Sequence, residues 1–366
     1  MSELLKKSGT SIRNSNIEFL RIISMMFIVL SHVCVHSGFD VSVMTVQINK
    51  LFIRWGVLGN LGVDIFVMIS GYFLCERNFG LKQLIRLWTQ VWTYSTLILL
   101  GCGVFMEYPL SVKRIISAFL PTIFAEYWFF TAYIVLMLIT PLLNEFIKYT
   151  SRSTYDKILL TLFVVWFAIP TISMQNMFSD EIPQFIFLYL LGAYFKKYPE
   201  NLLNSPVLQK CLTIISFGVL FSSTVVMALI KENFISYQFY LRNSVVIIGC
   251  AVGLFAISVY SNPKHNKLVN LVGSCTFGIY LIHDNNIVRE LLWTDWLSNI
   301  NYVNSIMFIP RLIASVLIVF VVSLAIEFSR QKTIARPLEN IVYNIVSYVI
   351  KKTNNMISKT KNSLKL

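Results

Sequence analysis

The stretch Arg21–His32, RIISMMFIVLSH, places an arginine and a histidine at the two ends of an almost entirely apolar run. A run of this kind is typical of the middle of a membrane-spanning helix. Because a helix turns about 100° per residue, eleven steps bring His32 back to within about 20° of Arg21, roughly 16 Å along the axis. The sequence therefore predicts one helix face that carries a cation at one end and an imidazole at the other.

The composition of the chain indicates an integral membrane protein. Of its 366 residues, 56% are hydrophobic and 13% are charged, and the mean hydropathy is +0.66. A soluble domain cannot bury so much apolar surface, so we expect an all-α, polytopic membrane fold. The net charge of +13 fits basic cytoplasmic loops better than a nucleic-acid partner. The six cysteines lie mostly in apolar runs without CxxC spacing, which favours core residues over disulfides or metal ligands.

Apolar segments of membrane-spanning length recur along the whole chain. We expect ten spans with a short sixth one, at roughly 17–36, 51–75, 84–106, 122–146, 158–174, 183–195, 211–230, 242–260, 268–287 and 306–328. The run 110–120 could lie in the interface before the fourth span. A small-residue cleavage site does not follow the first run, so we expect that run to be retained. The predicted organisation is a cytoplasmic segment (1–16), a transmembrane domain (17–328) and a basic cytoplasmic tail (329–366).

The distribution of basic residues supports this topology. With the N-terminus in the cytoplasm, twenty-two Lys and Arg residues lie on the cytoplasmic side and six lie outside. This bias and the even number of spans place both termini in the cytoplasm, and we expect the bacterial cytoplasmic membrane as the location. The tail segment ENIVYNIVSYVIKK (339–352) has an amphipathic pattern typical of an interfacial helix on anionic membrane lipids.

Ionisable residues inside a membrane helix are costly and are therefore functional candidates. Arg21 could hold a phosphate or carboxylate near the cytoplasm, and His32 could act as a base or acid deeper in the membrane. An elongated substrate with an anionic inner end and a reactive tip, such as an acyl coenzyme A, fits both.

The alternative is structural: Arg21 pairs with Glu18 at i,i+3 and reaches the inner surface. His36 lies four residues after His32 and permits metal ligation, but without a nearby acid this pattern is weak, and no metal is expected.

The spacing of Arg21 and His32 resembles the signature of the acyltransferase-3 family of integral membrane acyltransferases. Five further blocks resemble family blocks in the expected order: GVDIFVMISGYFL (62–74), LKQLIRLWTQVW (81–92), YWFFTAYIVLMLITPLL (127–143), FLYLLGAYFKK (187–197) and FGIYLIH (277–283). Together they cover roughly residues 14–330. Each block alone is weak, and the ordered set is specific.

The resemblance has departures that limit what it implies. One branch of the family carries a Glu pair after the Trp of the fourth block, where this chain has Tyr133 and Ile134. The basic run before the third span keeps Lys82 and Arg86 but lacks the family's Pro. Some relatives add an extracytoplasmic esterase-like domain, whereas we expect this chain to use its membrane domain alone or with a partner.

Several further residues are candidates for the two substrates. Arg86, at the cytoplasmic start of the third span, could reach the phosphates or the pantetheine of coenzyme A, or it is an ordinary positive-inside arginine. His283 lies about as deep in its span as His32, so His283 or Asp284 could meet the acceptor. Arg311, near the outer start of the last span, could bind a sugar or a phosphate of the acceptor. Trp128 and its neighbour Phe129 could line the cavity, although core packing is the commoner role of such residues.

Asp64 lies inside the second span and needs a partner there. It could orient His32 or a basic residue. It could also form a structural pair with Arg54 or with another helix, which is the interpretation that we favour.

The sequence thus predicts an O-acetyltransferase that moves an acetyl group from acetyl-CoA to a hydroxyl of a surface polysaccharide or its lipid-linked precursor. In this hypothesis His32 is catalytic, Arg21 and Arg86 bind the donor, and the other candidates meet the acceptor. A secondary transporter or flippase is an alternative, since charged residues in spans can mark a translocation path. A membrane-embedded glycan polymerase is a third, but the longest outer loop has only about 18 residues.

Overall fold

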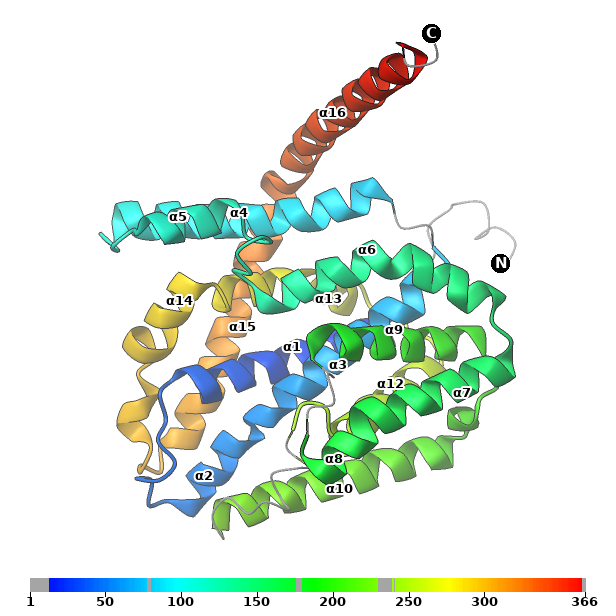
Figure 1. Ribbon diagram of the computed structural model, residues 1–366. Helices are drawn as coiled ribbons and strands as arrows, with labels where there is room; N and C mark the ends of the chain where they lie inside the picture. Colours follow the sequence, from blue (N-terminus) through cyan, green and yellow to red (C-terminus); the bar gives the residue numbers. More distant parts are fainter. Residues whose placement is uncertain (1–12, 78–79, 176–179, 230–238, 240, 364–366) are drawn as a thin grey trace.

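The computed structural model describes residues 13–77, 80–175, 180–229, 239 and 241–363, with side chains up to residue 357. The described residues form helices and connecting turns, without a strand (Figure 1). The predicted all-α fold is therefore confirmed.

Helices lie at all ten predicted spans, with bounds that differ by a few residues. They are α1 (Ser15–His36), α2 (Gln47–Arg54) with α3 (Leu58–Leu74), α4 (Leu81–Phe105), α6 (Trp128–Tyr149), α7 (Arg152–Phe163) with α8 (Ile169–Ser173), α9 (Glu181–Lys197), α10 (Pro206–Leu229), α12 (Val245–Tyr260), α13 (Lys267–His283) and α15 (Phe308–Thr333). A 3₁₀ turn joins α2 to α3, and a π-helical turn joins α7 to α8. Shorter helices are α5 (Val112–Phe119), in the run thought to be interfacial, and α14 (Asn286–Leu291).

Not all of these helices are long and apolar enough to cross a membrane by themselves. Within the described residues, six segments meet that requirement: α1, α2 with α3, α6, α7 with α8, α10 and α15. Helix α12 is apolar but has 16 residues. The chain is therefore a polytopic membrane protein, while ten crossings and two cytoplasmic termini stay predictions.

Asparagine caps fix where α1 and α13 begin. The Asn14 side chain accepts a hydrogen bond from the Asn16 amide, and the Asn266 side chain accepts from the Leu268 and Val269 amides. Such caps satisfy amide groups that have no partner within the helix. The Ser15 hydroxyl then donates to the Asn270 side chain at 2.8 Å, so the two helices start side by side.

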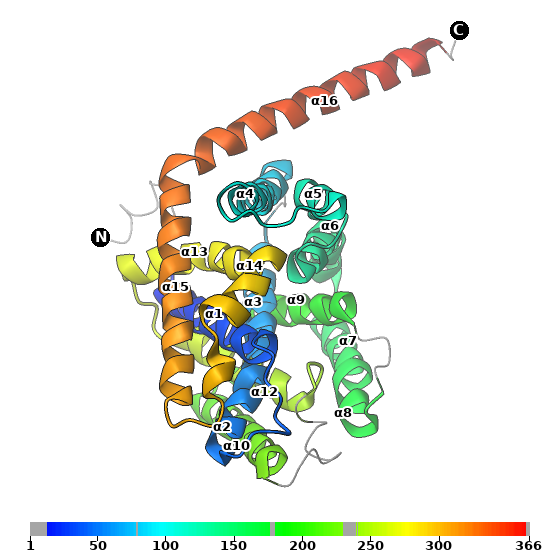
Figure 2. The ribbon, with the colours of Figure 1, turned by 90° about the vertical axis from the view of Figure 1, so that its left-hand side faces the viewer.

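Helix α3 lies between α1 and α9, and glycines allow the close approach on both sides. A Cβ on Gly59 would lie 2.3 Å from Cβ of Ser31 on α1. A Cβ on Gly192 of α9 would lie 2.0 Å from the Met68 carbonyl oxygen on α3. Helices in membranes pack closely through such small residues. This packing holds α1, which carries both Arg21 and His32, in the centre of the bundle (Figure 2).

Helices α13 and α15 cover α1 from another side, and α15 crosses α13 at a steep angle in Figure 2. Helix α15 continues to Thr333, five residues beyond the predicted end of the transmembrane domain at 328. The tail then forms α16 (Ala335–Ser363), which projects away from the bundle in both views. Its exposed apolar side chains include Ile341, Ile345 and Val349, in agreement with the amphipathic pattern expected of the tail.

Candidate active site

Two histidines from distant parts of the sequence meet where the C-terminal ends of α1 and α13 lie together. His32 lies near the end of α1, and His283 is the last residue of α13. His283 Nε2 lies 3.0 Å from His32 Nδ1, and the ring centroids are 5.0 Å apart. His283 is fully buried, and its Nδ1 lies 2.6 Å from the Ile279 carbonyl oxygen one helical turn earlier. One edge of the His32 ring is therefore engaged by protein.

An acidic residue and an arginine complete this side of the site. Asp284 Oδ1 lies 3.5 Å from His32 Nδ1, and the Asp284 side chain is 2% exposed. Arg289, which belongs to the short helix α14, lies 3.4 Å from the same carboxylate oxygen. The carboxylate is thus paired with a cation, which lowers the cost of burying it.

His32 also lines a narrow cavity of about 70 Å³ that is mostly apolar. The other lining residues are Met25, Ile28, Ser31, Gly59, Asn60, Val63, Phe66, Trp128, Phe129, Phe277 and Tyr280. The His32 side chain is 12% exposed, so its ring borders space that a small reacting group can occupy. The structure thereby places Trp128 and Phe129 at the cavity, as the sequence suggested. His283 and Asp284, which are both described, are not among its lining residues.

Arg21 lies on the α1 face that also carries the cavity residues. Met25, Ile28 and His32 follow Arg21 at helical spacings of three and four residues, and these three line the cavity. The Arg21 guanidinium is 3.9 Å from Glu18 and lies over the Phe73 ring at 5.9 Å. Its side chain is 26% exposed, and its Nε has no hydrogen-bond partner among the described atoms. Arg21 therefore keeps unused donor capacity.

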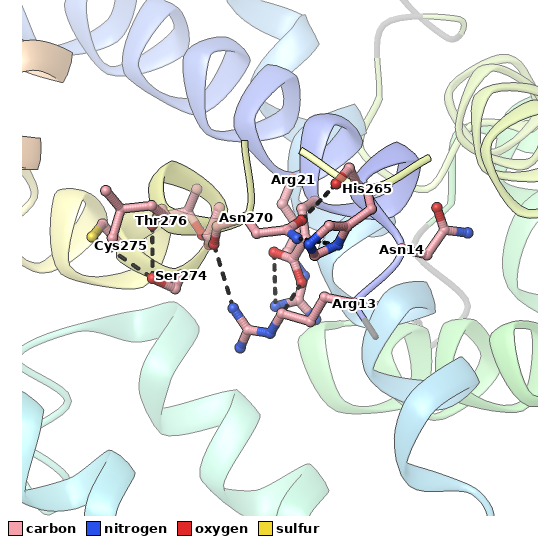
Figure 3. A network of polar contacts seen from close by, with 12 residues as sticks. Arg13, Asn14, Arg21, His265, Asn270, Ser274, Cys275 and Thr276 are labelled. Carbon is pink, nitrogen blue, oxygen red and sulfur yellow. Dashed lines mark hydrogen bonds and ion pairs between the residues drawn. The ribbon is translucent and has the colours of Figure 1, made fainter. Parts of the chain in front are cut away.

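Glu18 contacts Arg13 and Arg21, which belong to a polar network where the start of α1 meets the start of α13 (Figure 3). Its carboxylate is 3.9 Å from Arg13 as well as from Arg21. Arg13 also donates to the Asn270 carbonyl at 3.4 Å. The structural pair of Glu18 and Arg21 that the sequence offered as an alternative is present. It is a loose ion pair, because both distances exceed hydrogen-bond length.

Arg86 and Arg311 lie at other contacts. Arg86 is 70% exposed and lies 3.7 Å from Glu339 of α16. Arg311 donates to the Leu297 carbonyl at 3.2 Å, and its guanidinium lies 4.0 Å from the centre of the Tyr302 ring. The structure thus joins neither arginine to the cluster around His32.

Asp64 is fully buried on α3, and Gln184 of α9 donates to it at 3.0 Å. This contact is the link to another helix that we favoured. The same end of α9 lies near Arg242, whose guanidinium stacks on the Trp128 ring at 4.4 Å. Asp64 therefore helps to hold together the wall of the cavity that Trp128 forms.

One group of side chains has the composition of a metal site. Ligand atoms of His32, His36 and Asp284 lie within 4.8 Å of one another, so the structure supplies the acid that the HxxxH pattern lacked in sequence. A divalent cation there would lie beside Asp284, whose Oδ1 is already 3.4 Å from Arg289. The donor set suits a metal, whereas the neighbouring guanidinium opposes a second positive charge.

Sequence reasoning missed several residues of the site. Phe277 and Tyr280 line the cavity two turns and one turn before Asp284, respectively, and their i,i+3 spacing within FGIYLIH could have indicated them. Ser31 and Asn60 also line it, but no sequence pattern distinguishes them. Arg289 follows Asp284 by five residues. Because α13 ends before Asp284 and α14 begins after it, helical periodicity does not relate the two positions.

The comparisons with known proteins agree with the family that the sequence resembles. The profile of the acyltransferase-3 family, described as an acyltransferase domain, matches residues 14–328. Neither a curated protein nor a solved structure gives a significant match. The profile covers most of the chain, including every described residue of the His32 cluster and its cavity. The chain therefore belongs to the acyltransferase-3 family and is a membrane acyltransferase.

Proposed function

We propose that this protein is an O-acetyltransferase that transfers an acetyl group from acetyl-CoA to a hydroxyl of a cell-surface polysaccharide or its lipid-linked precursor. The observation that carries the proposal is the continuous α1 face from Arg21 through Met25 and Ile28 to His32. It offers a guanidinium with unused donors at the cytoplasmic end and an imidazole beside a small cavity roughly 16 Å away along the axis. Family membership favours acyl transfer over transport or polymerisation.

The donor is an extended molecule in this proposal. Arg21 binds phosphate oxygens of coenzyme A near the cytoplasm, since a guanidinium forms two parallel hydrogen bonds to such a group. Arg86 would contribute only from the surface, because it is 70% exposed. The pantetheine arm runs along the apolar face of α1, and the thioester reaches the cavity. A cavity of about 70 Å³ supports a short acyl group rather than a long chain.

His32 acts as the general base. The acceptor hydroxyl gives its proton to the imidazole while its oxygen attacks the thioester carbonyl. The new C–O bond forms, the C–S bond breaks, and the imidazolium returns the proton to the coenzyme A thiolate. A positioned general base contributes about 10²–10⁴-fold in rate. The aromatic rings of Trp128 and Phe129 offer flat apolar faces to the sugar or to pantetheine.

The proposal is tested with purified protein in lipid nanodiscs. Coenzyme A release from acetyl-CoA is measured with and without surface glycans extracted from cells that lack the gene, and mass spectrometry locates any new acetyl ester. We expect glycan-dependent release and a mass increase of one acetyl group per modified sugar. Acyl-CoA donors with longer acyl chains, tested at the same concentration, should react more slowly. The proposal would be rejected if the purified protein cleaved no thioester in the presence of a glycan that cells carrying the gene do acetylate.

A further inference from the structure

We propose that His283 is a positioning residue that fixes the tautomer of His32, so that Nε2 of His32 is the atom that accepts the proton. This inference rests on the proposed function of His32. It assigns His283 a different role from the acceptor contact that the sequence suggested.

The first contact determines the tautomer of His283. Its Nδ1 lies 2.6 Å from the Ile279 carbonyl oxygen. A carbonyl oxygen can only accept, so Nδ1 must carry the hydrogen. His283 is fully buried and its ring contacts those of Tyr280 and Trp293, in surroundings where a charged imidazolium would be costly. A neutral imidazole with hydrogen on Nδ1 has a free lone pair on Nε2.

The second contact makes the tautomer of His32 depend on that of His283. His283 Nε2 lies 3.0 Å from His32 Nδ1, and a hydrogen bond there needs one donor. Since His283 Nε2 is the acceptor, His32 Nδ1 carries the hydrogen and donates it. The lone pair of His32 is then on Nε2, on the edge of the ring that His283 does not occupy. His32 borders the cavity. In this proposal the free edge is the one that meets a substrate hydroxyl.

Asp284 supports the same direction of proton transfer. Its carboxylate lies 3.5 Å from His32 Nδ1 and is held by Arg289 at 3.4 Å. When His32 takes a proton on Nε2, both ring nitrogens carry hydrogen and the ring becomes positive. A carboxylate beside Nδ1 stabilises that cation, as the acid of a catalytic triad stabilises its histidine. If His283 carried hydrogen on Nε2 instead, His32 would be protonated on the cavity side and could not act as a base.

The direct test is ¹⁵N NMR of the full-length protein in nanodiscs with labelled histidine. The chain has four histidines, so the His32 signals can be assigned by difference from a His32→Gln variant. We expect the His32 Nδ1 signal in the range of a protonated nitrogen and the Nε2 signal in the range of an unprotonated one. The opposite pattern would overturn the inference. This measurement does not depend on activity, so it remains decisive even if the proposed reaction is wrong.

Kinetics of two matched variants give an independent readout. His283→Gln can still place a carbonyl oxygen where Nε2 accepts from His32, whereas His283→Asn can reach only toward the Ile279 carbonyl. We expect kcat of His283→Gln within about tenfold of wild type, kcat of His283→Asn lower by about 10²-fold, and an unchanged KM for acetyl-CoA in both. Equal kcat values for the two folded variants would contradict a role through the His32 contact.

Discussion

Replacing Arg21 by alanine separates two roles that one guanidinium can have. In the proposed function Arg21 binds the phosphates of coenzyme A, and in the structural alternative it only neutralises Glu18. The Glu18 carboxylate is 6% exposed and lies 3.9 Å from both Arg21 and Arg13. Losing Arg21 therefore leaves Glu18 with one cation at the same distance. The two roles predict effects of different size on different measurements.

The expected magnitudes follow from these contacts. Removing the sole partner of a buried charge costs about 3–5 kcal/mol, but Arg13 stays in place and Arg21 is 26% exposed. We therefore expect Arg21→Ala to lower the free energy of unfolding by about 1–2 kcal/mol. A hydrogen bond to a charged group contributes about 1.5–3 kcal/mol, so losing even one of the two proposed bonds weakens donor binding by about 10–150-fold, and we expect Arg21→Ala to lose at least that much. Arg21→Lys keeps the charge but not the forked geometry, and we expect about a tenfold loss.

The assay is acetyl-CoA affinity by isothermal titration calorimetry, with Tm recorded on the same nanodisc samples. Arg13→Ala is the matched control, because it removes a cation at the same distance from Glu18 without touching the face of His32. It should lower Tm by a similar amount and leave donor affinity unchanged. If folded Arg21→Ala binds acetyl-CoA as tightly as wild type, Arg21 is structural and the coenzyme role is wrong.

Two further predictions concern the fold. Reporter fusions after Lys50 and Ser298 should report the outer side and a fusion after Arg77 the inner side, and a reversed signal would show that a crossing has been miscounted. Gly192→Ala should lower the free energy of unfolding by about 1–3 kcal/mol, because its Cβ would meet the backbone of α3 at 2.0 Å. Gly218→Ala, which has no atom within 4 Å of the new Cβ, is the matched control and should leave Tm unchanged or slightly higher in the same thermal scan.

The fold could be predicted from the sequence because membrane helices are specified by local composition. Every predicted span coincides with a helix, since apolar length and the need to satisfy backbone groups leave few alternatives in lipid. The 3₁₀ turn at Trp55–Val57, which divides the second predicted span into α2 and α3, could not be predicted. The extension of α15 to Thr333 could not be predicted either. They depend on packing against neighbouring helices and on cap geometry, which carry weak local signals.

The site could be predicted in part. The shared face of Arg21 and His32 follows from helical periodicity, and the structure places the cavity on that face. The contact between His32 and His283 joins residues 251 positions apart, so periodicity could indicate their similar depth but not which atoms meet. The same limit applies to Asp64, because nothing near it in sequence points to Gln184 on α9.

The central claim is that His32 is the base for acyl transfer, and turnover of a His32→Ala variant tests it most directly. The measurement is transfer of radiolabelled acetyl from acetyl-CoA to the glycan by wild-type and variant protein in nanodiscs, with donor affinity recorded on both. We predict that kcat falls by at least about 10²-fold while donor affinity stays close to wild type, since His32 lies beside the cavity and the proposed phosphate contact is at Arg21. Tm should fall modestly, because buried His283 loses its partner. Wild-type turnover in the folded variant would contradict the account.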